Sequence, residues 1–192
     1  MHVMQLGHIR EFDGRFNIAV QDPLTRKPAS YDLTPQALAI LRSLDPTETD
    51  RDFTPEEKRL LELCSALRMV AMHDDDAPFS HLTIIPAPRY DVVLDAILEE
   101  GYRFSSEVDE PFETNEYGAR LLARVDGRTS LGDIALAVER DALADPEDTA
   151  AIRVHEVEQH QGFHDFLRDE VFRFVAALRG REAITFEATA AA

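Results

Sequence analysis

The stretch N-E-Y-G-A-R-L-L-A-R-V-D-G-R-T-S-L-G-D-I-A-L-A-V, residues 115–138, decides the fold that we expect for this sequence. Its first half predicts a helix that begins at the capping residue Asn115 and ends at the turn pair Asp126-Gly127. Its second half predicts another helix, which begins at Thr129 or Ser130. Apolar side chains recur at helical spacing in both halves, at Tyr117, Leu121, Leu122, Val125, Leu131, Ile134, Ala135 and Val138.

The sequence on either side predicts a third helix and several strands. The third helix carries its apolar residues on one face, at Phe163, Leu167, Val171, Phe174 and Leu178. Gly180 ends this helix, and residues 184–186 predict a closing strand. Strands are also predicted around residues 102–104 and around Phe112. A strand, three helices and a strand within about ninety residues are the outline of a winged helix-turn-helix.

The first half of the sequence predicts a hairpin and two helices. Asp13-Gly14 supplies the turn of the hairpin, because both residue types tolerate a positive φ. Thr34-Pro35 and Thr54-Pro55 begin the helices, each with a capping hydroxyl before a proline. Cys64, the single cysteine, falls within the apolar stripe of the second helix. We therefore expect a buried structural thiol, and a disulfide within the chain is excluded.

The polar, charged segment at residues 73–78 predicts a linker between two domains, residues 1–76 and residues 77–192. After it, residues 82–85 predict a strand that ends at Pro86. The apolar residues at 92, 93, 96 and 97 predict a helix, with Gly101 as its cap.

An internal repeat links the two predicted domains. Residues 31–46, YDLTPQALAILRSLDP, align without a gap on residues 112–127, FETNEYGARLLARVDG. Further on, residues 65–72 resemble residues 176–186. The first copy has no equivalent of the helix at 131–138. We expect an α+β protein built from tandem winged helix-turn-helix modules, the N-terminal one degenerate; chance similarity between amphipathic helices is the alternative.

Residues 115–138 resemble the PqqD-like family, whose members carry N-x-x-x-x-x-(I/L)-L-x-x-(L/V)-D-G-x-x-(T/S)-(V/L)-x-(D/E)-I after a strand. That family is the RiPP recognition element, a winged helix that binds the leader of a ribosomally made precursor peptide. The resemblance extends over residues 104–186, and the long insertion at 143–162 departs from the compact family pattern. It implies that a leader lies between residues 108–114 and the helix at 163–178.

The residues of these two segments suit such a peptide. A strand edge offers unpaired backbone groups to an extended peptide, and the third helix carries an apolar ring beside cationic side chains in its outer sector. The leader-binding residues that we predict are Val108, Asp109, Glu110, Phe112, Glu113, Thr114, Arg168, Phe172, Ala176 and Arg179. The alternative for Phe172 is a buried position under the closing strand or against the N-terminal module.

Composition and charge exclude several classes of function. The formal net charge is −17, from 37 acidic and 20 basic residues, so a nucleic-acid partner is not expected. No apolar run approaches the roughly 18 residues that a membrane span needs, and no secretory signal is visible, which predicts a cytoplasmic protein. His155, His160 and His164 leave a small metal site open as an alternative. Phosphate-binding loops and a nucleophile elbow are missing from the sequence, and we expect no autonomous enzyme and no cofactor in this chain.

The leading hypothesis is therefore an accessory subunit of RiPP biosynthesis that presents a precursor peptide to a catalytic partner in a heterodimer. By its architecture, the chain resembles partners of multinuclear non-haem iron oxidative enzymes, as in the thiaglutamate pathway, so iron is expected in the partner and not here. A radical SAM enzyme is the next partner class. A winged-helix regulatory module that does not bind DNA is the alternative function.

Overall fold

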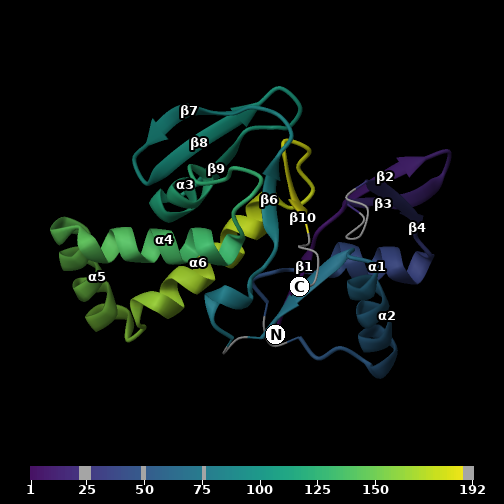
Figure 1. Cartoon of the computed structure of the whole chain (residues 1–192), viewed down its shortest axis with the longest axis horizontal. Helices are drawn as coiled ribbons and strands as arrows, with labels where there is room; N and C mark the ends of the chain where they lie inside the picture. Colours follow the sequence, from purple (N-terminus) through teal and green to yellow (C-terminus); the bar gives the residue numbers. More distant parts are fainter. Residues whose placement is uncertain (22–26, 49–50, 75–76, 188–192) are drawn as a thin grey trace.

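The computed structural model describes residues 1–21, 27–48, 51–74 and 77–187. It is a mixed α+β structure with several small antiparallel sheets, which confirms the α+β part of the predicted fold class. Figure 1 shows the first half of the chain on one side, with β2–β4, α1 and α2, and the second half on the other. Part of the predicted linker, residues 75–76, lies outside the described residues.

The first half forms one two-stranded and one three-stranded sheet with two helices. Its elements are β1 (His2–Gln5), β2 (His8–Phe12), β3 (Arg15–Gln21), β4 (Pro28–Asp32), α1 (Pro35–Ser43), α2 (Pro55–Ala66) and β5 (Val70–His73). The β2–β3 hairpin confirms the predicted turn, because Asp13 and Gly14 have φ angles of 52° and 72°. β5 returns to pair with β1.

The second half has the same order of strands with more helices. Its elements are η1 (Phe79–His81), β6 (Ile85–Pro88), β7 (Val92–Leu98), β8 (Gly101–Ser106), β9 (Phe112–Thr114), α3 (Glu116–Leu122), α4 (Leu131–Ala144), α5 (Pro146–Gln159), α6 (Phe163–Leu178) and β10 (Ile184–Glu187). β7, β8 and β9 form a meander as β2, β3 and β4 do, and β10 pairs with β6 as β5 pairs with β1. Within the described residues, α4 and α5 have no counterpart in the first half.

Side-chain caps explain where the main helices begin. Thr54 accepts a hydrogen bond from the backbone N–H of Glu57, whose carboxylate accepts from the N–H of Thr54 at 2.8 Å. The two bonds together form a capping box. Asn115 caps α3 by accepting from the N–H of Gly118 at 3.0 Å, and Ser130 caps α4. Each cap satisfies N–H groups that the first turn of a helix leaves without a partner.

The predicted helix at residues 92–97 is wrong, since this segment is the strand β7. A bulge between Leu94 and Ala96 interrupts the strand's alternation, so its apolar residues recur at a spacing that imitates a helix. The Leu98–Gly101 pair closes a tight hairpin, and Gly101 begins β8 instead of capping a helix. β-branched residues such as Val92 and Val93 favour a strand here.

Two further boundaries differ from the sequence-based expectation. The strand predicted from residue 82 begins only at Ile85, since the carbonyl groups of Leu82 and Ile84 accept hydrogen bonds from the N–H groups of Gly132 and Leu131 at the start of α4. The insertion at 143–162 contains the helix α5, which Asp145 caps by accepting from the N–H groups of Glu147 and Asp148. An acidic first turn favours this helix despite its weak apolar stripe.

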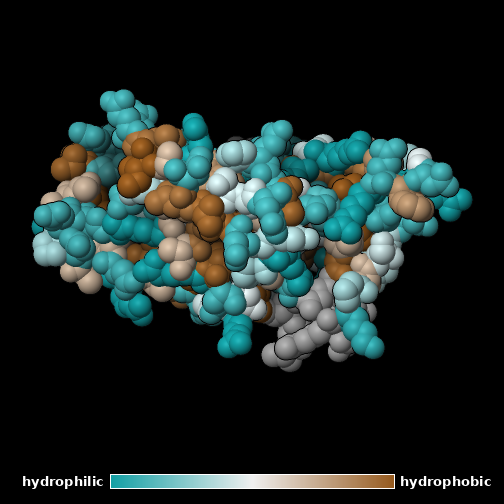
Figure 2. All heavy atoms as spheres, turned by 90° about the horizontal axis from the view of Figure 1, so that it is seen from above, coloured by the Kyte–Doolittle hydropathy of each residue, from teal (hydrophilic) through white to brown (hydrophobic). Residues whose placement is uncertain are grey.

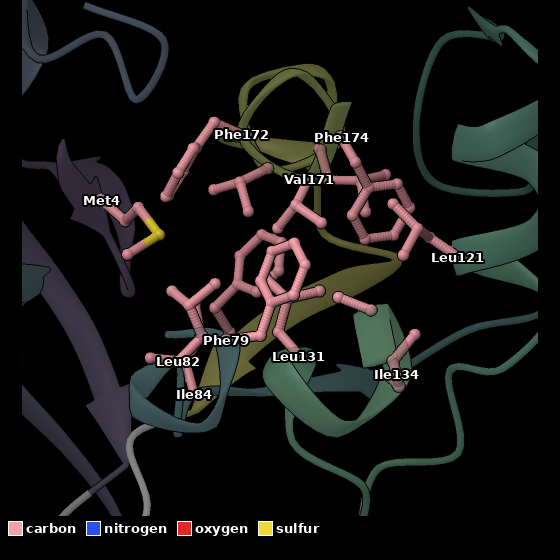
Figure 3. Close-up of a cluster of buried hydrophobic side chains, with 14 of the residues drawn as sticks. Met4, Phe79, Leu82, Ile84, Leu121, Leu131, Ile134, Val171, Phe172 and Phe174 are labelled. Atoms are coloured by element: carbon pink, nitrogen blue, oxygen red, sulfur yellow. The ribbon is translucent and has the colours of Figure 1, made fainter. Parts of the chain in front are cut away.

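The two buried clusters meet at β1. Val3 packs in the first cluster, with residues of α1 and α2, whereas Met4 packs in the second, with Phe172 and Leu131. Figure 3 shows Met4 pointing from β1 into the second cluster. Neighbouring residues of a strand point to opposite faces, so one strand contributes to both cores. The first strand of the chain therefore holds the two halves together.

Candidate peptide-binding site

β9 is an edge strand of the sheet β7–β8–β9. It pairs with β8 through Tyr102–Thr114, Arg103–Glu113 and Phe104–Phe112, and among the described residues no strand pairs with its other side. Its backbone can therefore accept one more strand, since an edge presents unpaired N–H and C=O groups. β4 is the corresponding edge strand in the first half.

The loop before β9 is fixed to the segment that enters β10. The Asp109 carboxylate accepts hydrogen bonds from the backbone N–H groups of Glu182 and Ala183 at 2.9 and 2.8 Å. Arg181 donates to the carbonyl of Glu110 at 2.5 Å. Asp109 and the Glu110 carbonyl thus hold the loop in place, while the Val108 side chain is exposed. Of these three predicted leader-binding residues, two already have structural partners.

Phe112 lies under the sheet with its ring covered. It is 8% exposed, its centroid lies 5.7 Å from that of Phe104, and the Arg181 guanidinium lies 4.5 Å above the ring. Glu113 points to the opposite, exposed face and accepts hydrogen bonds from Arg103 at 2.6 and 3.0 Å. These bonds raise the pKa of Arg103 above its usual value. The side chains of β9 therefore alternate between core and solvent, as an edge strand requires.

A buried carboxylate ties the end of β9 to α6. Glu170 is 3% exposed and accepts from the Asn115 side-chain amide at 2.5 Å. Arg173, one turn further along α6, is exposed and forms an ion pair with Glu170. A buried carboxylate needs such partners, because an unpaired charge would be costly to desolvate. Glu170 thus connects α6 to Asn115 by a hydrogen bond. Arg181, which follows the helix, connects it to the backbone carbonyl of Glu110.

Thr114 approaches α3 so closely that only glycine fits beneath it. A Cβ added to Gly118 would lie 1.7 Å from Thr114 Oγ1. A Cβ added to Gly101 would lie 2.5 Å from the Thr114 carbonyl oxygen. The two glycines allow β8, β9 and α3 to meet at this residue, which sets where the strand edge lies.

Phe172, the predicted aromatic anchor, has no exposed surface. Its ring stacks on His2, with centroids 3.5 Å apart and an interplanar angle of 14°. Phe172 therefore occupies the alternative position that we considered for it, buried against the first half of the chain. The helical spacing of α6 correctly predicted that Phe172 lies away from the apolar face of Phe163, Leu167, Val171, Phe174 and Leu178. It could not show that β1 covers this second apolar face. A peptide beside β9 does not reach this ring.

The other predicted residues of α6 are also used elsewhere. Arg179 donates to the carbonyl of Leu41 at 2.5 Å, and burial lowers its pKa while the nearby Asp45 opposes that shift. Arg168 pairs with Asp165 at 3.0 Å, and Ala176 is half-buried. Arg179 therefore joins α6 to the C-terminal end of α1. It does not line the edge of β9.

Glu170, Arg173 and Arg181 are the residues near β9 that the sequence analysis missed. Glu170 and Arg173 lie on one side of α6 at an i, i+3 spacing, and Arg181 follows the end of this helix. Their contacts with Asn115 and Glu110 place this side of α6 beside β9. The capping residue Asn115 was recognised, and a glutamate able to bind its amide would have been the signal to look for.

The histidines and the cysteine do not form a reactive centre in the part of the chain that the structure describes. His164 contacts Glu139 at 2.8 Å, whereas His155 lies against the ring of Phe166. No group of three or more potential metal ligands occurs among the described residues. Cys64 is buried, which raises the pKa of its thiol.

Exposed apolar side chains gather on β7, the opposite edge of the same sheet. Val93, Leu94 and Ile97 are 55%, 51% and 75% exposed. Seen from above, apolar surface is concentrated over the half of the molecule that contains this sheet (Figure 2). The sheet thus has a polar edge strand at β9 and an apolar one at β7.

Comparisons with protein-family models, with curated proteins and with solved structures found no match for this chain. No helix in the described part of the chain combines the length and the apolar character that crossing a membrane requires. The geometry of the site therefore carries the functional argument.

Proposed function

We propose that this chain binds the leader of a ribosomally made precursor peptide and presents the peptide's core to a separate modification enzyme. The observation that carries the proposal is the edge strand β9, fixed at both ends and unpaired by any described strand on its outer side. An extended leader would add as an antiparallel strand and gain affinity from main-chain hydrogen bonds. A rigid edge favours binding, because little ordering remains to be done when the peptide arrives.

The side chains next to this edge favour a leader with acidic residues. Arg173 is 63% exposed on α6, and Arg181 lies over Phe112. Both guanidinium groups can contact a carboxylate of the added strand, as arginine does in bidentate pairs. They supply selectivity, while the backbone supplies affinity that tolerates sequence variation.

The partner in this proposal is a larger peptide-modifying enzyme. The resemblance to PqqD-like proteins implies a multinuclear non-haem iron oxidative enzyme, with the iron held by that enzyme. Tethering the leader would hold the modifiable residue near the active site at an effective concentration in the millimolar range.

Calorimetry with a panel of synthetic precursor leaders tests the proposal. Arg173→Glu should weaken the binding of an acidic leader by about tenfold, because it replaces attraction by repulsion at the strand edge. The thermal midpoint of this variant must stay near that of the parent chain, because Arg173 also pairs with the buried Glu170. Arg153→Glu is the matched control, since Arg153 is an exposed arginine on α5. It should leave the affinity unchanged.

Glu113→Pro tests the strand addition separately from the charges. If the N–H of residue 113 faces the leader, proline removes a donor and affinity falls. The thermal midpoint of the variant must stay near that of the parent chain, because Glu113 also pairs with Arg103. Failure of every leader to bind the unaltered chain would overturn the proposed function.

A further inference from the structure

In the second half of the chain, an apolar groove beside α6 is filled by the first strand of the chain. Met4 and Leu6 belong to the same buried cluster as Phe172, Leu82, Ile84 and Phe186. Figure 3 shows Met4 entering the space between Phe172 above and Leu82 and Ile84 below. The strand β1 thus inserts alternate large side chains beside α6, and this packing joins the two halves.

The first half contains the corresponding groove. α2 comes before β5, which pairs with β1, and α6 comes before β10, which pairs with β6. At the ends of these two helices, residues 65–68 align with residues 176–179. Continuing that alignment back along both helices places Leu61 where α6 has Phe172. The pairing of β5 with β1 and of β10 with β6 places Met72 at the position of Phe186 and Met1 at that of Ile84.

This second groove is open. Its volume is about 450 Å³, and it is lined by Met1, Arg51, Phe53, Lys58, Leu61, Glu62 and Met72. Leu61 is 1% exposed at its floor, while Met72 is 40% exposed, against 6% for its counterpart Phe186. The difference has a simple cause: in the second half β1 covers this region, and no described residue of the first half does so.

The rim of the open groove carries a different charge pattern. Lys58 stands where the second half has Asp169, and Glu62 stands where it has Arg173. Arg51 is held over the ring of Phe53 at 4.8 Å and donates to the carbonyl of Ser43 at 2.8 Å. Arg51 also pairs with the Glu57 carboxylate at 3.4 Å, so the cation that matters for an occupant's charge is Lys58. This pattern favours an occupant that carries an acidic side chain.

We propose that this groove binds an extended segment of a partner protein that inserts two alternating large apolar side chains and carries a carboxylate beside Lys58. The second half shows how such a segment packs, because Met4 of β1 and Leu6, just after this strand, pack in this manner. The reversed charges discriminate between the two grooves, as charge complementarity does at other interfaces. The inference goes beyond leader binding and does not depend on it, since the groove lies beside α2 and not beside β9.

A synthetic peptide tests the groove directly. It carries the β1 sequence His-Val-Met-Gln-Leu with a glutamate added at each end, and it is titrated into the ¹⁵N-labelled chain. Amide resonances of Lys58, Glu62 and Met72 should shift. Lys58→Glu should weaken the binding by about fivefold or more, since it removes the attraction to the carboxylate. Arg153→Glu, the same charge change on α5, should not alter it.

Three results would overturn the inference. The first is that no amide resonance shifts at millimolar peptide. The second is that only residues outside the groove show shifts. The third is that Lys58→Glu and the unaltered chain bind the peptide with equal affinity. If the free chain dimerises and the same resonances move with its own concentration, a second copy and not a partner fills the groove. Lys58→Gln, which only removes the charge, provides a second variant in case the reversal impairs folding, and it should weaken binding less.

Discussion

The imidazole of His2 lies flat on the ring of Phe172, with centroids 3.5 Å apart, and its Nδ1 is 2.7 Å from the carbonyl oxygen of Pro46. The pair joins the second residue of the chain to the last long helix. His73 lies beside it, paired with His2 across the β1–β5 ladder and 5.8 Å from the Phe172 ring. The contact between the two halves is thus aromatic and buried, and several consequences can be measured.

Phe172→Ala should lower the free energy of unfolding by about 3–5 kcal/mol, because it leaves a cavity at a fully buried site. Denaturant unfolding measures this loss, and Phe172→Leu should recover part of it. Leader affinity measured on the folded fraction should not change, since the ring faces β1 and not β9. A stable Phe172→Ala protein with impaired leader binding would place the peptide on this face instead.

Gly118→Ala should destabilise the chain by about 1–3 kcal/mol, because the new methyl group would collide with Thr114 Oγ1. Thr114→Ala in the same chain removes that oxygen and should restore part of the stability. A double-mutant cycle of thermal unfolding gives the coupling between the two positions. Additive effects of the two substitutions would contradict the close contact.

Cys64 should react slowly with thiol reagents in the native protein. Burial raises the pKa of the thiol, so the thiolate fraction at neutral pH is small. Cys64→Ala should cost about 1–2 kcal/mol of stability and leave the proposed leader binding unchanged. Labelling as fast as in the unfolded chain would show that Cys64 does not lie on the buried face of α2.

Stability should fall as the pH is lowered from about 7 to about 5.5, the range in which an unperturbed histidine takes up a proton. Burial lowers the pKa of His73, and the neighbouring His2 lowers it further. The unfolded chain therefore binds this proton at a higher pH than the folded chain does, and folding stability is lost on acidification. His81 acts in the same direction, whereas Asp74 and the contact with Ala77 oppose the shift.

His73→Gln removes the titrating group and should flatten this part of the stability curve. Urea unfolding at several pH values, with His155→Gln as the control, measures the difference. The same slope for His73→Gln and the unaltered chain would assign the pH dependence to other groups.

The local sequence was sufficient for features that depend on adjacent residues. The caps at Thr54 and Asn115 and the turn at Asp13-Gly14 were predicted correctly, because each needs only side chains a few residues apart. The burial of Cys64 also followed from helical spacing alone. β7 was mistaken for a helix, since its bulge shifts the apolar residues away from strict alternation.

Tertiary packing decided which surfaces remain open. Phe172 and Arg179 are residue types that often occur in binding sites. In the folded chain, however, β1 packs on Phe172 and α1 binds the side chain of Arg179. The contacts of β9 with Glu170 and Arg181 join residues far apart in the sequence, and no local pattern predicts them. By itself the sequence determined where the capped helices begin, the β2–β3 turn, the α+β class and the acidic charge, all of which arise from neighbouring residues or from composition. The helix from Asn115 ends at Leu122, earlier than the predicted end at Asp126-Gly127. Only the tertiary structure decided that β1 fills one of two related grooves and leaves the other open, because that depends on which strand the folded chain brings against each helix.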